Sequence, residues 1–310
     1  MVKKILVYII LTVALVIGFT GWSMTGSKNP ADGKAAAQSS AAERSQEPPA
    51  VPAKDRDDPG LIDFNSILDG IGQDKEAALL EHKKADINGD GTDDDIYLIG
   101  IQPKNYTGLY QENMKIIILD GKSGELTSIP ADSGNGYWYD IFAGDFDGDK
   151  IKDILFSVNN DMAGGAGQYT FTVYSCKNGK VSKLFDNEKL RNELEFSVNF
   201  KDGYKVEINC PGNNKSFTVD VSDKKATYRK LGLYDGEDKL IKPEEGWVDN
   251  YNRLAPEDVD KDGVLELKGQ QYVSGYGHSD EIGTLSSVLK WDRKKQNWIV
   301  TDIDFKRTEK

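Results

Sequence analysis

The hydrophobic and polar positions divide the chain into three regions. An uncharged, mostly apolar run covers residues 5–27, directly after Lys3 and Lys4. Residues 28–60 contain no aromatic residue, Leu or Ile, but they hold half of the prolines. From residue 61 to residue 310, short apolar runs alternate with polar turns, which is the pattern of β-strands rather than of long helices. The pattern therefore predicts an apolar leader, a linker and a β-rich body.

The leader, residues 1–27, is predicted to be a signal anchor. As a helix, residues 5–27 would reach about 34 Å, enough for a hydrocarbon core of about 30 Å. The preceding lysines favour a cytoplasmic N-terminus. We therefore expect a single-pass protein of the cell membrane with an extracytoplasmic C-terminal domain. Secretion after cleavage of a signal peptide is the alternative, because the strongly apolar part is only as long as the core of such a peptide.

The linker and the body follow from composition. Residues 28–60 have too little apolar surface to offset the entropy lost on ordering, so they are predicted to be a disordered Ala/Pro-rich linker. Residues 61–310 are predicted to form the folded domain.

Three acidic loops, each leading into a strand-like run, interrupt the body. Each has an oxygen-bearing side chain at relative positions 1, 3, 5 and 9 and a main-chain carbonyl available at position 7. The three sets are Asp86, Asn88, Asp90, Thr92 and Asp94; Asp145, Asp147, Asp149, Ile151 and Asp153; and Asp258, Asp260, Asp262, Val264 and Glu266. Calcium takes about six to eight oxygen ligands, which alternate residues of a tight loop can supply. We therefore expect up to three bound Ca²⁺ ions.

Two other interpretations of these loops are weaker. An EF-hand would have Glu at position 12 followed by a helix, but position 12 is Tyr97, Phe156 or Gly269, and strand-like runs follow. Ordinary turns are also rich in Asp and Gly. However, two carboxylates about 4 Å apart repel by roughly 4 kcal/mol at an effective dielectric constant of about 20, so three such loops favour a cation.

Each loop belongs to a longer repeat of strand, loop, strand, connection, strand, turn and strand. The turns come 33 to 34 residues after the first aspartate of each loop, as at Asp120-Gly121. A fourth copy without acidic ligands is expected near residue 202. Four-stranded units at this period predict an all-β fold, a β-propeller or propeller-like array of about four to five units.

The loops also resemble a known repeat. The segment Gly144–Asp149, followed by Asp153-Ile154-Leu155, is similar to the FG-GAP and VCBS repeats of integrin-type propellers and of exported bacterial proteins. The similarity covers three segments of ~45 residues. It implies a propeller with calcium in its loops and says little about function.

A Gly-rich connection in the third repeat is a candidate ligand pocket. Tyr276, His278 and Asp280 lie in this connection, residues 274–280, and the second repeat has a similar connection at residues 159–167. If both lie at one edge, these three side chains would be polar contacts to a ligand. Flexible hairpin loops are the alternative interpretation.

Other conspicuous residues have structural interpretations. A short amphipathic stretch, residues 74–80, predicts a helix with His82 exposed near its end. Cys176 and Cys210 form either a disulfide or two buried thiols. The tryptophans expected to pack in the core rather than to bind a ligand are Trp138, Trp247, Trp291 and Trp298. Residues 136–139, which include Trp138, are the segment most expected to be the exception.

Charge and composition restrict the function. A net charge of −12 argues against nucleic acid as a partner, and two His residues leave little room for zinc chemistry. No nucleophile elbow or phosphate loop is present. We expect a calcium-stabilised module at the cell surface that binds an unknown protein or glycan, or contributes to envelope architecture, without catalysis. A calcium-dependent extracellular hydrolase and an accessory subunit of an extracellular sensor are the alternatives.

Overall fold

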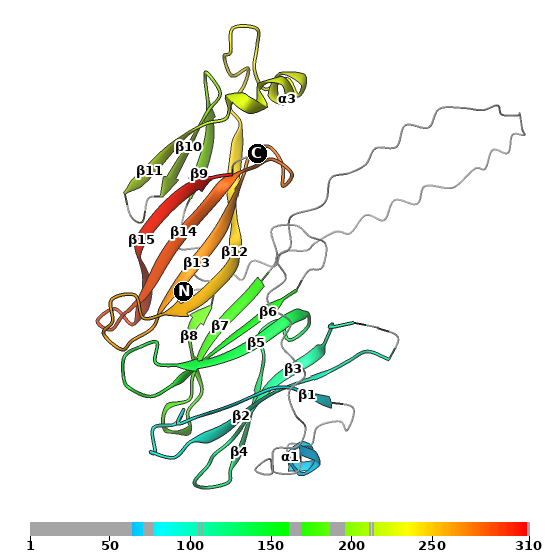
Figure 1. Cartoon of the computed structure of the whole chain (residues 1–310), viewed down its shortest axis with the longest axis vertical. Coiled ribbons are helices and arrows are strands. Elements are labelled where there is room, and N and C mark those ends of the chain that lie inside the picture. Colours follow the sequence, from blue (N-terminus) through cyan, green and yellow to red (C-terminus); the bar gives the residue numbers. More distant parts are fainter. Residues whose placement is uncertain are drawn as a thin grey trace, which may run out of the picture. The chain divides into compact units, whose positions relative to one another are not determined.

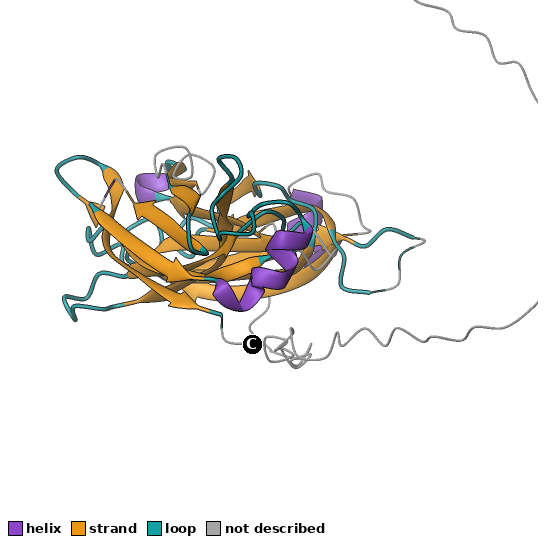
Figure 2. Cartoon of the chain, turned by 90° about the horizontal axis from the view of Figure 1, so that it is seen from above, coloured by secondary structure: helices purple, strands orange, loops and turns teal. Residues whose placement is uncertain are grey.

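The structure is a computed structural model, and its described residues are 64–70, 77–104, 106, 108–160, 169–186, 196–210, 212 and 214–308. All of them belong to one compact unit, Pro59–Lys310. They form 15 antiparallel strands in three sheets with a few short helices, which confirms an all-β fold (Figures 1 and 2). The predicted anchor, residues 1–27, and linker, residues 28–60, lie outside the described residues. Among the described helices, none has the length and apolar character needed to cross a membrane.

The first sheet is a four-stranded meander. Its strands, in spatial order, are β1 (Ala77–Ala85), β2 (Asp94–Ile101), β3 (Glu112–Leu119) and β4 (Leu126–Pro130). Successive side chains of a strand point to opposite faces. Ile96 and Leu98 of β2 therefore pack towards the second sheet, whereas Tyr97 and Ile99 pack with helix α1 (Phe64–Gly70). Both faces are buried, which explains why β2 and β3 read as continuous apolar runs.

The second sheet repeats this arrangement. Its strands, in order, are β5 (Tyr137–Gly144), β6 (Asp153–Asn159), β7 (Tyr169–Ser175) and β8 (Ser182–Asp186). Ile154 and Phe156 of β6 share a core with the first sheet. Leu155, on the opposite face, shares a core with Leu267 and Trp298 of the third sheet. The second sheet is thus covered on both faces by other sheets.

The third sheet has seven strands in the order β11-β10-β9-β12-β13-β14-β15. Its last four strands form a third meander with the same order as the first two sheets (Figure 1). The strands are β9 (Ser197–Lys201), β10 (Lys205–Cys210), β11 (Lys215–Asp220), β12 (Glu245–Glu257), β13 (Glu266–Ser274), β14 (Glu281–Asp292) and β15 (Asn297–Arg307).

The predicted number of four-stranded units is not what the structure has. The hairpin expected near residue 202 is present as β9 and β10, but it has a third strand, β11, and no fourth. In place of a fourth strand, the short helix α3 (Lys225–Lys230) buries Tyr228 in the core. Because β12 is 13 residues long, its first residues extend past β13 and pair with β9 through Gly246 and Val198. The expected fourth unit therefore continues the third sheet.

The helix predicted before His82 was wrong for residues 77–80, which are part of β1, while residues 74–76 lie outside the described residues. His82 lies in β1, because this segment pairs with β2 along its length. Its Nε2 lies 2.7 Å from Oδ1 of Asp95, and its ring stacks on Tyr97 with centroids 4.7 Å apart. The histidine is therefore a half-buried sheet residue. Cys176 and Cys210 are both free and buried, so of the two alternatives the structure has two thiols.

The four tryptophans that were expected in the core differ in their burial. Trp291 and Trp298 are buried between the second and third sheets, as predicted. Trp138 is 39% exposed and has a φ of 45°, which is rare for a bulky residue, so the expectation of a core position was wrong there. The bulge between Tyr137 and Asp140 turns this residue outward. Trp247 is half-buried, and its Nε1 donates to Asp249.

Candidate functional site

The three acidic loops occupy the same place in their sheets. Each connects the first two strands of a meander: β1 to β2, β5 to β6, and β12 to β13. The residue at position 9 begins the second of these strands in every case. The main chain also has a positive φ at positions 4 and 6 of each loop. The residues concerned are Gly89 and Gly91, Gly148 and Lys150, and Lys261 and Gly263. The loops are therefore three copies of one conformation, and strands follow them as predicted.

Main-chain amides hold the acidic side chains in a similar way in each copy. In the second loop, Asp145 accepts hydrogen bonds from the amides of Gly148 at 2.6 Å and Lys150 at 2.9 Å. Asp86 accepts the equivalent bonds from Gly89 and Gly91, whereas Asp258 accepts from Asp262 and Gly263, at positions 5 and 6. The acid at position 9 accepts from the amide at position 2, as Asp153 does from Phe146 at 3.1 Å. Hydrogen bonds within each loop thus fix the positions of these carboxylates without a ligand.

The second loop gathers carboxylates in a buried place. Asp145, Asp147 and Asp153 each offer an oxygen within 4.8 Å of the others. Asp145 is 5% exposed and Asp153 is 1% exposed. Burial raises the pKa of Asp153 to about 7 and also raises the pKa of Asp147. No described Lys or Arg pairs with these three acids, so a hard cation fits this loop on charge and donor type.

The third loop has a cation of its own. Asp258, Asp260 and Asp262 also bring oxygens within 4.8 Å of one another. Lys290 of β14 contacts Asp260, lies 3.2 Å from Asp262 and lies 3.1 Å from Oε1 of Glu266. The hydrogen bond to Asp260 raises the pKa of Lys290. One ammonium group thereby neutralises part of the charge of this loop.

The first loop is the least acidic of the three. The side-chain nitrogen Nδ2 of Asn88 donates to Asp120 at 2.7 Å and lies 3.4 Å from Oδ1 of Asp94. That oxygen also accepts from the amide of Gly121 at 3.0 Å. Within the described residues, the second and third loops gather three acids and this loop does not. Asp120 was not predicted as part of the site, although the sequence marked it as the turn after β3.

The loops form a continuous row across the three sheets. The carbonyl at position 1 of one loop accepts from the amide at position 8 of the next. Asp86 accepts from Lys152 at 3.2 Å, and Asp145 accepts from Leu265 at 2.8 Å. Side chains pack at the same contacts, since Gly89 lies against Ile151. Each loop is therefore also a joint between neighbouring sheets.

A second set of contacts repeats along this row. The carbonyl at position 3 of a loop accepts from the turn between the last two strands of the next meander. Asn88 accepts from the amide of Asn178 at 2.9 Å, and Asp147 accepts from Nε of Arg293 at 2.9 Å. Arg293 also donates to the carbonyl of Gly148. Sequence reasoning missed these residues, because their partners are up to 146 positions away.

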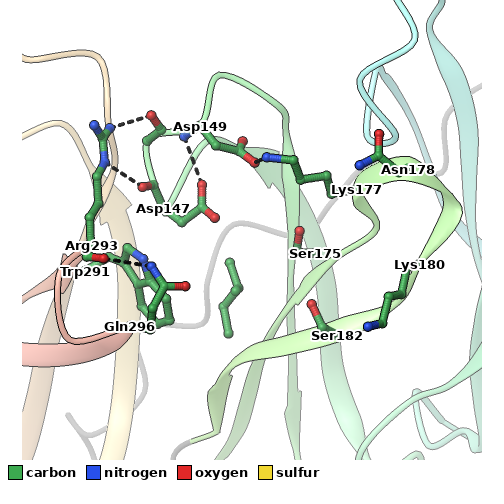
Figure 3. A pocket seen from close by; sticks show the side chains of 12 residues that line it. Asp147, Asp149, Ser175, Lys177, Asn178, Lys180, Ser182, Trp291, Arg293 and Gln296 are labelled. Carbon is green, nitrogen blue, oxygen red and sulfur yellow. Dashed lines mark hydrogen bonds and ion pairs between the residues drawn. The ribbon is translucent and has the colours of Figure 1, made fainter.

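A pocket of about 640 Å³ opens beside the second loop (Figure 3). Its walls come from this loop, from β7 and β8 with the turn between them, and from the β14–β15 hairpin. Lys177 of the turn pairs with Asp149 at 2.8 Å. The lining residues are Asp147, Gly148, Asp149, Ser175, Lys177, Asn178, Lys180, Ser182, Leu184, Trp291, Arg293 and Gln296.

The predicted ligand residues of the third connection lie in different surroundings. Asp280 is 4% exposed, and it accepts from Lys224 at 2.6 Å and from Tyr228 at 3.0 Å. Tyr276 is partly exposed, and its amide donates to Asp280 at 3.2 Å. The exposed ring of His278 lies against Trp247, with centroids 4.9 Å apart. Asp280 therefore has a structural partner, and a ligand role for the three residues stays a prediction. Residues 161–168, in the matching connection, lie outside the described residues.

Comparison with known proteins places the chain in a different family from the one expected. Residues 194–306 match the sequence model of the YybI C-terminal domain. A protein of Bacillus subtilis (strain 168), uncharacterized protein YybI, is 31% identical over 218 residues, which is 70% of this chain and 81% of that protein. The resemblance to FG-GAP and VCBS repeats was therefore wrong as a family assignment. Spaced aspartates cap the main-chain amides of a tight loop, so local chemistry produces this motif outside those repeats.

Proposed function

The chain belongs to the YybI family, and we propose that its folded part is a calcium-stabilised β module of the cell surface that serves binding or envelope architecture. The second loop would hold the strongest calcium site, with Asp145, Asp147, Asp149 and Asp153 as side-chain ligands and the carbonyl of Ile151 as a further oxygen. The first and third loops would bind more weakly. Catalysis is not part of this proposal.

One observation carries the calcium proposal. Three carboxylates of the second loop lie within 4.8 Å of one another, two of them buried. Ionising such a group is unfavourable, because both burial and neighbouring negative charge oppose it. A divalent cation removes both penalties, and the donors are all oxygens, as calcium requires. The third loop differs because Lys290 already supplies a positive charge there.

The proposed role of calcium is structural. Main-chain hydrogen bonds join the loops in a row, so an ion in one loop would stiffen a joint between two sheets. Extracellular calcium modules bind with a Kd of about 10⁻⁴–10⁻³ M. A ligand that binds only the folded state stabilises it by about 2.7 kcal/mol at a hundredfold excess over Kd. An extracytoplasmic module would therefore be folded more stably where calcium is abundant.

We also propose a propeller-like array for the three meanders. The first two sheets and the β12–β15 quartet share strand order and loop position, and their faces share cores. The strands β9 to β11 extend the third meander, so the array would be open. The location at the cell membrane depends on residues 1–27, and secretion after cleavage is the alternative.

Calcium titration of the full-length protein by isothermal calorimetry tests the proposal. We expect at least one ion per chain with a Kd of about 1 mM or tighter. Asp147→Asn should remove that binding, whereas Asp132→Asn, outside the loops, should not. Absence of calcium binding at this affinity would overturn the calcium role, and identical titrations for the two variants would move the site away from the second loop.

A further inference from the structure

The pocket beside the second loop gathers cations although the whole chain is acidic. Lys177, Lys180 and Arg293 line it together with Asp147 and Asp149, whereas the chain carries a net charge of −12. Three cations line the pocket against two acids, and two further acids of the loop, Asp145 and Asp153, bring oxygens within 4.8 Å of those of Asp147. With a Ca²⁺ ion in this loop, as proposed above, the charge at the pocket would be positive. A charged cleft concentrates ligands of the opposite sign even when the net charge of the protein opposes them.

Two of these cations have no carboxylate partner among the described residues. Lys177 pairs with Asp149 at 2.8 Å. Arg293 instead donates to the main-chain carbonyls of Asp147 and Gly148, which fixes the guanidinium group without neutralising it. Lys180 is exposed and makes no ion pair there. The pocket therefore has two positive charges available to an anion, one of them held in place by main-chain carbonyls.

These two charges lie on different walls. Arg293 comes from the β14–β15 hairpin, and Lys180 comes from the turn before β8, beside Ser182 (Figure 3). A ligand with acidic groups at intervals along its length would reach both, so the geometry favours an extended anion.

The rest of the lining suits a sugar. Leu184, which is half-buried, and the small exposed part of Trp291, which is 9% exposed, provide apolar surface, while Ser182 and Gln296 provide polar groups. A pyranose ring has an apolar face and hydroxyl edges, and apolar surface with polar neighbours matches both. The volume, about 640 Å³, lies within the range of roughly 300–1,000 Å³ typical of small-ligand sites.

We propose that this pocket binds a segment of an anionic glycan, with phosphate or carboxylate groups contacting Lys180 and Arg293 and a sugar ring against Leu184 and the exposed edge of Trp291. The inference rests on the proposed function, because an ion in the second loop would offset the acids beside the pocket. An ion held by Asp147 and Asp149 would add positive charge at the same rim, so calcium and glycan would strengthen each other's binding.

Three hexameric probes test the proposal on the full-length protein by calorimetry. They are a hyaluronan hexasaccharide, which carries carboxylates, a glycerol phosphate hexamer, and neutral maltohexaose. We expect the anionic probes to bind and the neutral one not to bind. The tighter of the two anionic probes identifies the acidic group. Neutral binding as tight as anionic binding would overturn the proposal.

Charge-neutralising variants locate the site. Lys180→Gln and Arg293→Gln should each weaken binding of the anionic probe about tenfold, the loss of one charge-assisted contact. Lys230→Gln, an exposed lysine of α3 outside the pocket, is the control for net charge. Lys180→Gln should leave the melting temperature and the calcium titration unchanged, which separates this result from the calcium proposal. Equal binding of the anionic probe by Lys180→Gln and Lys230→Gln would contradict the glycan proposal.

Discussion

The ammonium nitrogen of Lys290 lies 3.1 Å from Oε1 of Glu266, a residue that is 2% exposed at the start of β13. The other carboxylate oxygen of Glu266 accepts from the amide of Val259 at 2.9 Å. The third loop thus has a cation against its buried acid at position 9, whereas the cation of the second loop, Lys177, pairs with Asp149 and not with the buried Asp153. This difference separates two loops whose sequences look equivalent.

Removing this internal cation should make the third loop respond more strongly to calcium. In chelator, Lys290→Met should lower the free energy of unfolding by about 2 kcal/mol, because Glu266 remains buried without its partner. Calcium should restore more stability to this variant than to the wild type. Urea unfolding with and without calcium measures both effects.

Lys268→Met is the matched control for Lys290→Met. Lys268 pairs with Glu257 at 3.1 Å, but both side chains are about half exposed. Such a pair contributes at most about 1 kcal/mol. If Lys290→Met and Lys268→Met changed stability and calcium response alike, Lys290 would not be a counter-ion of the loop.

The ion pair between Lys224 and Asp280 should be important for stability. The two side chains are 12% and 3% exposed, and their charged atoms are 2.6 Å apart. Lys224→Met should cost about 3 kcal/mol, because it leaves a buried carboxylate unpaired. Lys239→Met, which loses an exposed pair with Glu237, should change urea unfolding by less than about 0.5 kcal/mol. Equal effects of the two substitutions would refute a structural role for Asp280.

Gly148 and Gly91 test how closely neighbouring sheets approach the loops. Both have a positive φ, 74° and 87°, so alanine strains the main chain at either position. A Cβ at Gly148 would also collide with the guanidinium group of Arg293, whereas nothing lies within 4 Å at Gly91. Thermal melts should show that Gly148→Ala costs about 1 kcal/mol more than Gly91→Ala. No difference would mean that the contact with Arg293 is not maintained.

The buried thiols should be chemically inert in the folded protein. Burial raises the pKa of Cys176 to about 12 and that of Cys210 to about 11, so both stay neutral at pH 8.5. The unfolded thiol ionises near pH 9, so stability from the neutral thiols is present below that pH and is lost as pH rises towards 11. Mass spectrometry after iodoacetamide treatment should show no alkylation at pH 8.5 in buffer and two adducts in urea. Rapid alkylation of folded protein would contradict this burial.

Local chemistry made the strands and the loops predictable. Alternating or continuous apolar runs predicted the strands of the meanders, and the spacing of Asp145, Asp147 and Asp149 predicted the loop between two strands. Strands and loops could be predicted because each depends on residues that are close in sequence. The segment before His82 was misread as a helix because a short amphipathic stretch fits either structure. Pairing with β2, a tertiary effect, decides it.

The relationships between sheets were not predictable from one sequence. Arg293 reaches Asp147 across 146 positions, and nothing in the local sequence of either residue marks the other. The pairing of β9 with β12 depends on which strand edge is free once the third meander has formed. Family membership was also misjudged, because a short loop motif covers too little of the chain to identify the family.

The most direct test of the calcium account is the melting temperature of the full-length protein in calcium and in chelator, for the wild type and for Asp147→Asn. At a hundredfold excess over Kd, calcium should raise the melting temperature of the wild type by about 5 °C or more. The same concentration of magnesium should do less, and Asp147→Asn should lose most of the calcium effect. A wild-type melt that is the same in calcium and in chelator would contradict the account.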